Sequence, residues 1–445
     1  MSNSSSRSTS FPGPMSPPET DSSVETRTQH RAPTPQEGSS PPVKPPVPRL
    51  LGVDVARGVA ILGMFVVHVG VGWTLADGTN PLQPLAAGRS AALFALLAGV
   101  SIALLSGGHD RKVNKDLGVA LWRVVVRAVI LLILGTALTM LGTPVSVILA
   151  YYAVFFVFAC MLLTERWTVI AGAAATLGFI GPIVSFWIRS RIDRGGTMAR
   201  IVETVNAYDP LVALADDGVV NFLLTGSYPA ITWLPFVFAG LAIGRLDLRQ
   251  PRVRWRLVAV GAGMAAAAYT LSWLAIRGLG LDERLAATLD PDTGIPFGID
   301  GFNQLYAEGM GGTVPATDWA WLLVTAPHSG TFMDVYGAGG VAIALLGLCL
   351  IVTDALGRAR WLVYPLIAVG SLSLTTYVGH ILLIWLDEND MLDGTPLSFL
   401  SEWLSLSVLL GSLIFATLWH RLVKRRGPLE GPLHVVSTWV AKRIP

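Results

Sequence analysis

The ionisable residues of the first apolar segment are the clearest candidates for chemistry. Residues 49–73 read RLLGVDVARGVAILGMFVVHVGVGW, with Asp54 and Arg57 near one end and His68 toward the other. Every side chain from 59 to 67 is apolar or glycine, so the segment is predicted to cross a membrane as a helix. Ionisable groups at membrane depth are unfavourable unless they face protein or water, so each of the three is a candidate functional residue.

The spacing of these residues predicts a common face. Arg57 and His68 differ by 11 positions, which at about 100° per residue returns a helix to nearly the same azimuth. They would be separated by roughly 16 Å along the helix axis, with Asp54 one turn before Arg57. A simpler interpretation makes Arg57 an interfacial anchor paired with Asp54, and His68 a neutral imidazole bonded to a neighbouring helix. Close approach of such helices would be allowed by the glycines of this segment, Gly58, Gly63, Gly70 and Gly72.

A second polar group lies in a later apolar segment, GSLSLTTYVGHILLIW (370–385). Ser373, Tyr377 and His380 occur at i, i+4 and i+7, so they share a helix face. His68 and His380 each lie about 14 residues past the start of their helices, and both helices are predicted to run outward. We therefore predict two imidazoles at one depth, facing a common cavity; the alternative is that each is satisfied separately.

Composition indicates a polytopic membrane protein. Of 445 residues, 52% are hydrophobic and 14% are charged, and the mean hydropathy is +0.56. The net charge of +2, without a basic patch interleaved with aromatic residues, argues against a nucleic-acid partner. Both cysteines, Cys160 and Cys349, lie in apolar segments and are interpreted as small core residues. Residues 1–48 are rich in Ser and Pro and are predicted to form a disordered cytoplasmic tail.

About ten apolar segments are long enough to cross a membrane, so we expect an all-α bundle of about ten transmembrane helices. They lie at 55–75, 86–106, 118–141, 144–163, 167–188, 219–244, 255–276, 335–356, 366–386 and 401–422. Lys and Arg gather in the loops 107–116, 164–166, 245–254 and 357–360 and at 424–426, which places both termini in the cytoplasm. The outer loop 189–218 also carries arginines and is the exception. The multi-pass domain is expected to span 49–430, with a cytoplasmic tail at 431–445.

The loop 277–334 supplies a third catalytic candidate. It ends in ATDWAWLLVTAPHSGTF, where Trp319 and Trp321 suggest contact with the membrane interface. His328 follows on the outer side; a lone histidine there is more often a turn residue than a catalytic one. The prolines of two spans, in Gly181-Pro182 and at Pro229 and Pro235, indicate either simple kinks or a polar cavity beside them.

The motifs resemble those of a known family, the membrane acyltransferase-3 family. Asp54, Arg57 and His68 match the spacing of that family's first-span motif. Gly370, Ser373, Tyr377 and His380 resemble its later G-x-x-S-Y-x-x-Y-x-x-H element, with leucine in place of the first tyrosine. LFALLAGVS (93–101) resembles its second-span segment, with Ala-Gly in place of Ser-Gly.

A second resemblance involves the first span and the segments APHSGTF and RRGPLE. These look like an uncharacterised family of bacterial multi-pass proteins that is similar to the catalytic domain of heparan-alpha-glucosaminide N-acetyltransferase. That enzyme places an asparagine at the end of the first span and a histidine in the following loop. Here His68 occupies the first position, and loop 76–88 contains no histidine.

The resemblance implies transfer of an acyl group, commonly acetyl, from cytoplasmic acyl-CoA to an envelope glycan or lipid. The protein would then be a multi-pass enzyme of a bacterial plasma membrane, in contact with membrane lipids. One of His68, His380 and His328 would act as base or acyl carrier, and Tyr377 would orient the base or stabilise the oxyanion. The CoA phosphates would meet cations, for which the candidates are Arg57 with its neighbour Asp54, together with Arg111, Lys112, Arg123 and Arg127.

Two other functions remain open from the residues alone. In a proton-coupled transporter or exporter, Asp54, Arg57 and the histidines would form a proton path, although no internal repeat is evident. In a non-catalytic scaffold, the Pro-rich tail would recruit partners. Metal sites, phosphate loops and hydrolase elbows are not evident, and GAGMAA (261–266) and GAGG (337–340) are interpreted as helix-packing glycines.

Overall fold

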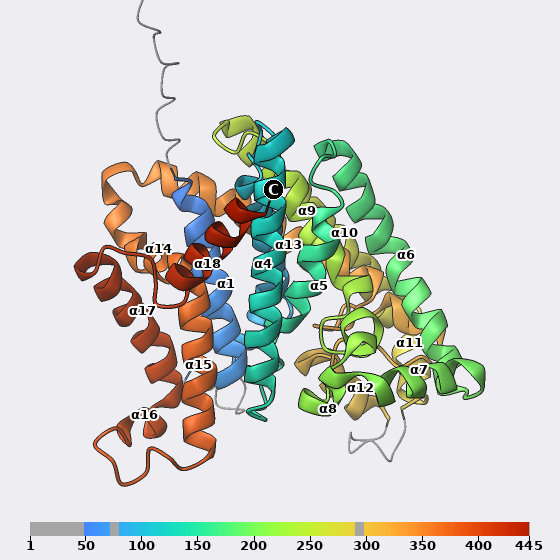
Figure 1. The fold of residues 1–445 in the computed structure, drawn as a ribbon. Helices are drawn as coiled ribbons and strands as arrows, with labels where there is room; N and C mark the ends of the chain where they lie inside the picture. Colours follow the sequence, from blue (N-terminus) through green and yellow to red (C-terminus); the bar gives the residue numbers. More distant parts are fainter. Residues whose placement is uncertain (1–48, 72–79, 290–297, 445) are drawn as a thin grey trace, which may run out of the picture. The chain divides into compact units, whose positions relative to one another are not determined.

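The computed structural model describes residues 49–71, 80–289 and 298–444, and no β-strand occurs in these ranges. The predicted tail 1–48 therefore lies outside the described residues, as does Gly72. From Leu50 onward the chain forms one folded unit built from helices (Figure 1). The predicted all-α membrane class is supported, because several of these helices are long and apolar.

Seven helical segments in the described part of the chain are long and apolar enough to cross a membrane. They are α1 (Leu51–Val69), α2 and α3 (Gln83–Ala86 and Arg89–Leu105), α4 (Asn114–Thr139), α6 (Trp167–Asp193), α10 with η2 (Pro251–Trp273 and Leu274–Gly278), α13 (Phe332–Ala355) and α17 (Leu404–Leu422). A bent pair is an eighth candidate. Two shorter apolar helices, α5 (Leu149–Cys160) and α9 (Ala230–Gly244), account for the other predicted spans.

The bent pair corrects the prediction of one continuous span over 366–386. The helices η5 (Gly357–Val363) and α14 (Tyr364–Ser371) meet α15 (Ser373–Glu388) at an angle of 74°. The break lies at Leu372, between the two halves of the predicted polar motif. Ser373, Tyr377 and His380 all fall in α15, so their common helix face is preserved. Similarly, the sixth predicted span is interrupted between η1 (Asn221–Thr225) and α9.

Helix α1 lies inside the bundle, in contact with α3, α13 and α14. A β-carbon at Gly58 would collide with the backbone of Leu366, and one at Gly370 would collide with the backbone of Asp54. These two glycines therefore allow α1 and α14 to pack backbone to backbone. Gly261 and Gly340 do the same for α10 and α13, as the sequence predicts. Gly70 instead ends α1 with a positive φ of 72°.

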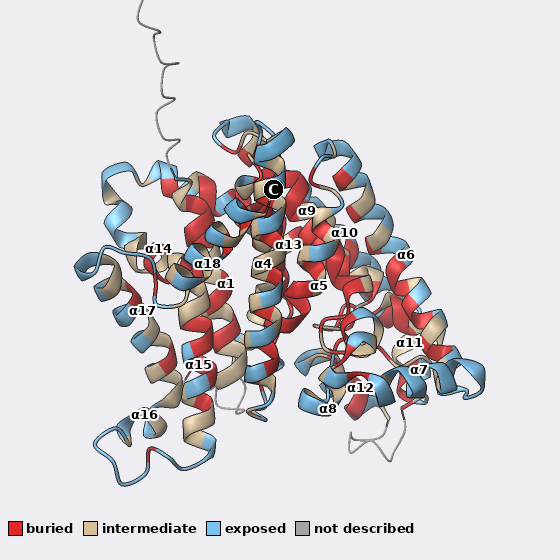
Figure 2. Ribbon diagram, viewed as in Figure 1, coloured by how far each residue is buried: buried red, intermediate tan, exposed pale blue. Residues whose placement is uncertain are grey.

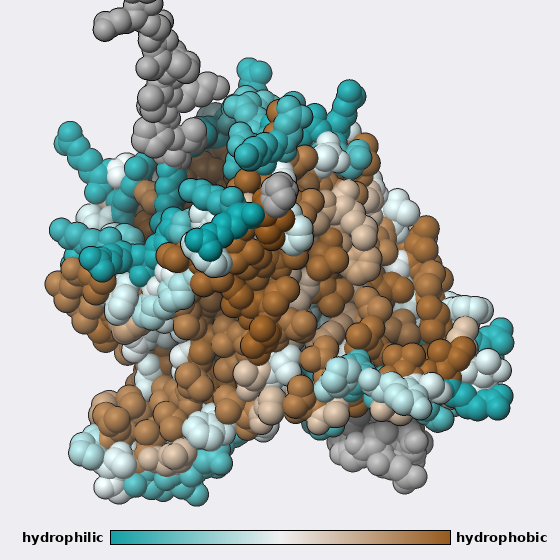
Figure 3. All heavy atoms as spheres, in the orientation of Figure 1, coloured by the Kyte–Doolittle hydropathy of each residue, from teal (hydrophilic) through white to brown (hydrophobic). Residues whose placement is uncertain are grey.

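Burial divides the helices into inner and outer groups (Figure 2). In the most apolar 18-residue window of α1, 61% of the residues are buried, whereas in that of α17 only 11% are buried. Ile133 of α4 and Ile414 of α17 are among the exposed apolar side chains. The surface shows a hydrophobic belt between more hydrophilic ends (Figure 3). Such a belt on the outside of a bundle is typical of a lipid-facing surface.

The long loops are more ordered than the sequence suggests. The loop 189–218 holds α7 (Thr197–Tyr208) and α8 (Pro210–Ala215), and the loop 277–334 holds α11 (Leu281–Ala286), α12 (Ile299–Glu308) and η4 (Trp319–Leu323). Trp321 is fully buried in a small apolar cluster of this loop, and its indole donates to Thr288 Oγ1 at 3.0 Å. The predicted interfacial exposure of Trp321 is therefore wrong, whereas Trp319 is half exposed. A short α16 (Phe399–Glu402) precedes α17.

The segment that was predicted to be a C-terminal tail, 431–445, is mainly helical. Helix α18 (Glu430–Arg443) packs along α4. Its first residue, Glu430, accepts hydrogen bonds from the backbone nitrogen and the hydroxyl of Thr375, at 2.9 and 2.6 Å. Thr375 lies in the first turn of α15, so these bonds fix α18 beside the helix that carries His380.

Candidate functional site

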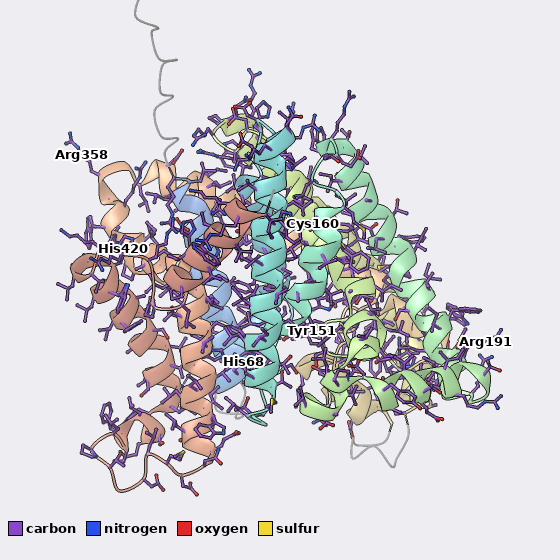
Figure 4. The ribbon with its side chains drawn as sticks, in the orientation of Figure 1. His68, Tyr151, Cys160, Arg191, Arg358 and His420 are labelled. Carbon is purple, nitrogen blue, oxygen red and sulfur yellow. The ribbon has the colours of Figure 1, made fainter. Side chains whose placement is uncertain are left out.

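The two histidines of the bundle are in direct contact. Nδ1 of His68 on α1 lies 3.0 Å from Nε2 of His380 on α15. The two rings are nearly parallel, with an interplanar angle of 9° and centroids 5.2 Å apart. The prediction that they share one depth is confirmed, and Figure 4 shows His68 in the half of α1 farther from its N-terminus. They bond to each other directly, however, instead of facing each other across a cavity.

The hydrogen bonds assign the protons of this imidazole pair. His380 Nδ1 bonds to the carbonyl oxygen of Tyr377, which can only accept, so Nδ1 carries the proton. In a neutral imidazole Nε2 is then an acceptor, and His68 Nδ1 must be the donor to it. The neutral pair therefore leaves His68 with an unprotonated Nε2. This distinction between the two histidines is not visible in the sequence.

The surroundings of His380 hold its ring in place. The side chain is 2% exposed, with the Phe65 ring 4.5 Å away and the Tyr377 ring 5.0 Å away in an edge-on arrangement. The Tyr377 hydroxyl accepts a hydrogen bond from the backbone nitrogen of Ile148, at 3.3 Å. Tyr377 thus positions the imidazole through its backbone carbonyl and its ring, whereas its hydroxyl reaches toward the start of α5.

The third candidate, His328, lies near this pair. Its ring stacks on Trp233 and meets Tyr228 edge-on, with both centroid distances 5.5 Å, and it is within electrostatic range of His68. Its carbonyl accepts from Gly312 at 2.9 Å, and the preceding Pro327 carbonyl accepts from Met310. Burial lowers the pKa of His328 from 6.5 to about 4, so the ring is neutral at ordinary pH.

The backbone of His328 is strained. Its φ is 55°, a left-handed conformation that costs an L-residue about 1–2 kcal/mol. The bonds from the 310–312 segment hold this conformation and direct the imidazole inward. Such strain, maintained by the surrounding structure, is typical of functional positions.

The predicted cation of the first span ties three helices together. Arg57 Nη1 lies 3.3 Å from Asp54 Oδ1 and 3.2 Å from the carbonyl of Gly370, and Nη2 donates to Ser101 Oγ at 2.8 Å. The predicted ion pair between Arg57 and Asp54 is therefore present, and the guanidinium links α1 to α3 and α14. Asp54 is 3% exposed, so its place in the site is to hold Arg57.

A cluster of basic side chains forms where α4 and α18 pack together; we refer to Arg123, Arg127, Arg426 and His434 as the basic cluster. Arg123 Nη2 lies 3.4 Å from His434 Nδ1, and Arg127 is within electrostatic range of both Arg123 and Arg426. The Nε atoms of Arg123 and Arg127 are buried without a hydrogen-bond partner among the described residues. A group of guanidiniums with unsatisfied donors is suited to a polyvalent anion.

Two members of the basic cluster were missed by sequence reasoning. The sequence shows Arg426 only as one of the cytoplasmic cations at 424–426 and within RRGPLE, and His434 lies in the segment 431–445, which is predicted to be a tail. No sequence signal joins either residue to Arg123. Conversely, two predicted cytoplasmic cations serve local structure: Arg111 donates to the carbonyl of Thr164 at 2.6 Å, and Lys112 donates to that of Leu105 at 2.9 Å.

A buried tyrosine whose hydroxyl is unsatisfied among the described residues lies within electrostatic range of both Arg57 and Tyr377. Tyr152 on α5 is 3% exposed, and its hydroxyl has no hydrogen-bond partner in the described part of the chain. It is within electrostatic range of Arg57, Tyr228 and Tyr377. The Phe94 ring lies between the rings of Tyr152 and Tyr377, at 5.7 and 6.4 Å. Nothing in the apolar segment 144–163 distinguishes this hydroxyl.

No family model matches this chain, and no curated protein shows significant similarity to it. The resemblance to the acyltransferase-3 family therefore stays a prediction, and the function has to be inferred from the chemistry of the site.

The cavity beside the proline-containing spans is apolar. A cavity of about 450 Å³ lies between α6, α9, α10 and α13, next to Pro235. Its walls are almost wholly apolar, including Phe236, Leu257 and Met264, and Arg256 stands at one edge. Of the two alternatives, the described residues favour simple proline positions within helices, because α6 continues through Pro182 and α9 through Pro235, and the cavity beside them is apolar.

Proposed function

We propose that this protein is an integral-membrane acyltransferase that moves an acyl group, acetyl in the simplest case, from acyl-CoA to an envelope glycan or lipid. The observation that carries the proposal is the buried His68–His380 pair, because its hydrogen bonds leave an unprotonated nitrogen on His68. The proposal retains ten spans, with the bent pair and the two short apolar helices each crossing a bacterial plasma membrane. Both termini are then cytoplasmic.

The imidazole pair supports general-base catalysis. His68 Nε2 takes the proton of the acceptor hydroxyl or amine while the acceptor atom attacks the thioester carbonyl. The carbon–sulfur bond breaks, and the departing CoA sulfur receives that proton from His68. His380 keeps Nδ1 of His68 hydrogen-bonded throughout and disperses the transient positive charge. Base catalysis of this kind contributes about 10²–10⁴-fold.

The basic cluster is the proposed site for the CoA phosphates. Two of its guanidiniums come from α4 and the third, Arg426, from the segment before α18, and two of their buried donors have no protein acceptor in the described residues. Arg57 lies roughly 16 Å from His68 along α1, so the acyl group would have to reach that far into the bundle. The Tyr152 hydroxyl, within electrostatic range of both Arg57 and Tyr377 and without a partner in the described residues, is a candidate donor to the acyl-CoA.

The proposal is tested by analysing the cell envelope. A deletion strain is compared with the same strain carrying the wild-type gene or the His380→Gln variant, and envelope lipids and glycans are analysed by mass spectrometry. The proposal expects one acyl modification to disappear on deletion and to return only with the wild type. An envelope that is chemically identical in all three strains contradicts it.

A proton-coupled transporter is the second candidate. The observation that favours it is the sequence of buried titratable groups from Arg57 past Tyr152 and Tyr377 to the histidine pair. Such groups form proton paths in membrane transporters. Substrate counter-transport by proteoliposomes that contain the purified protein and no acyl-CoA would favour this function over acyl transfer.

A further inference from the structure

A pocket with both aromatic and polar groups in its wall lies at the end of the bundle where α3 begins and α10 ends. Its volume is about 540 Å³. The residues that line it include Arg89, Tyr269, Trp273, Tyr306, Thr325 and Pro327. Three aromatic rings, one guanidinium and hydroxyl groups therefore face one space that is large enough for a sugar-sized ligand.

The guanidinium of Arg89 is held in a fixed position. Its Nε donates to the Tyr269 hydroxyl at 3.0 Å, and the group lies 5.1 Å from the centroid of the Tyr269 ring. Nη1 donates to the carbonyls of Pro84 and Ala87, at 2.7 and 3.2 Å. The buried carboxylate of Asp334 is within electrostatic range but forms no ion pair with it in the described residues. Arg89 thus offers an oriented positive charge at the pocket wall.

The other residues that line the pocket combine aromatic rings with hydroxyl groups. The Tyr306 hydroxyl and Thr325 Oγ1 are 2.8 Å apart, and Thr325 Oγ1 donates to Ser272 at 3.2 Å. Trp273 remains more than half exposed and presents its indole beside the pocket. Aromatic faces pack against the apolar faces of sugar rings, while hydroxyl networks exchange hydrogen bonds with sugar hydroxyls.

The pocket borders the loop that carries His328. Pro327 forms part of its wall, and the next residue sends its imidazole to the other side, against Trp233 and within electrostatic range of His68. A β-carbon at Gly88, just before Arg89, would lie 3.2 Å from Pro327, so the start of α3 and this loop are tightly packed. The pocket wall and the histidine cluster thus share the adjacent residues Pro327 and His328.

We propose that this pocket binds the acceptor, and that the acceptor is a sugar unit carrying a negatively charged group, phosphate or carboxylate. Arg89 receives the anion, and the aromatic residues receive the ring. The assignment of the ligand as acceptor rests on the proposed acyl transfer, whereas the binding itself does not. Binding is therefore measured without acyl-CoA.

The experiment titrates the full-length protein in nanodiscs and follows tryptophan fluorescence, because Trp273 borders the pocket. The probes are N-acetylglucosamine 1-phosphate, glucuronic acid, neutral N-acetylglucosamine and inorganic phosphate. The two anionic sugars are expected to bind more tightly than the neutral sugar and the phosphate. Whichever of them binds more tightly identifies the anion as phosphate or carboxylate. Equal affinity for all four probes, or no binding of either anionic sugar at millimolar concentration, overturns the proposal.

Variants then locate the binding. Arg89→Gln should weaken the anionic sugars by about ten- to a hundredfold and leave the neutral sugar unchanged, while Arg89→Lys retains part of the affinity. Arg200→Gln, which changes an exposed arginine on α7, is the matched control and should have no effect. An unchanged affinity in folded Arg89→Gln places the ligand elsewhere. His380→Gln should still bind the sugars; if it also still acylates, the proposed function fails while the pocket stands.

Discussion

Nδ1 of His68 lies 3.0 Å from Nε2 of His380, although 312 positions separate the two residues in the chain. Because His380 donates its single ring proton, on Nδ1, to the Tyr377 carbonyl, its Nε2 can only accept from His68; His380 therefore orients His68, and His68 presents the unprotonated nitrogen. The hydrogen bonds from His68 to His380 and from His380 to the Tyr377 carbonyl therefore give the two histidines different roles.

The two histidines should act as one unit. We expect His68→Ala and His380→Ala each to reduce acyl transfer by about 10²–10⁴-fold, and the double variant to lose little more than either single variant. Initial rates with purified protein and radiolabelled acetyl-CoA measure this. Losses that multiply in the double variant would mean that the residues act independently.

The basic cluster should control affinity for acyl-CoA. Arg127→Gln is expected to raise KM for acyl-CoA by about tenfold, with kcat nearly unchanged, because it removes a charged donor far from the reacting atoms. The control is Arg111→Gln, whose guanidinium contacts the carbonyl of Thr164. A loss of kcat at unchanged KM in Arg127→Gln would contradict the phosphate-binding assignment.

The fall in the free energy of unfolding at acidic pH should depend on His328. Its pKa is about 4 when folded and 6.5 when exposed, so between these values only the unfolded chain binds the proton. The contribution of His328 to the free energy of unfolding is therefore fully present above pH 6.5 and is lost as the pH falls toward 4. At about 1.4 kcal/mol per pKa unit, the full effect is on the order of 3 kcal/mol.

His328→Gln should accordingly flatten the decline of the unfolding temperature between pH 6.5 and 4. Thermal scans in detergent at several pH values measure this slope. The matched control is His109→Gln, at an exposed loop histidine, which should retain the wild-type slope. If the His328 variant also retains it, the buried neutral imidazole is not the source of the acid sensitivity.

The packing of α1 against α14 should be sensitive to a single methyl group. Gly370→Ala brings a β-carbon onto the Asp54 backbone, and we expect a loss of about 1–3 kcal/mol in stability or a failure to accumulate. Gly379→Ala is the matched control in α15, since no atom lies within 4 Å of the added carbon. Equal unfolding temperatures for the two variants would show that α1 and α14 are not in close contact.

The hydroxyl of Tyr152 should not contribute to the stability of the fold. Tyr152→Phe removes a buried hydroxyl that lacks a partner in the described residues, so stability is expected to stay constant or rise. Tyr228→Phe removes a hydroxyl that donates to Ser146 at 3.2 Å and should lose about 1 kcal/mol. Thermal unfolding compares the two. A more stable Tyr228→Phe, or a less stable Tyr152→Phe, would contradict these hydrogen bonds.

The sequence predicted the juxtaposition of His68 and His380 because helix geometry is regular. Counting about 14 residues along two helices of the same direction places both side chains at one depth. The spacing of Asp54 and Arg57 likewise predicted an ion pair on one helix. Such inferences need only a constant rise per residue, together with the rule that buried charges need partners.

Features that depend on contacts between distant segments were not predictable. His434 joins Arg123 only because α18 folds back along α4, and the local sequence of α18 is polar enough to suggest a tail. Trp321 is buried by a small core that the Gly- and Asp-rich loop does not reveal. No proline marks the bend at Leu372, and the proton arrangement of the histidine pair follows from a single backbone carbonyl.

The central claim is that His68 is the base for acyl transfer. Its most direct test measures the transfer of label from [acetyl-¹⁴C]acetyl-CoA to the envelope fraction by membranes that contain equal amounts of wild-type or His68→Ala protein. The account predicts labelling by the wild type and only background with the variant. Labelling at the wild-type rate by His68→Ala would contradict it.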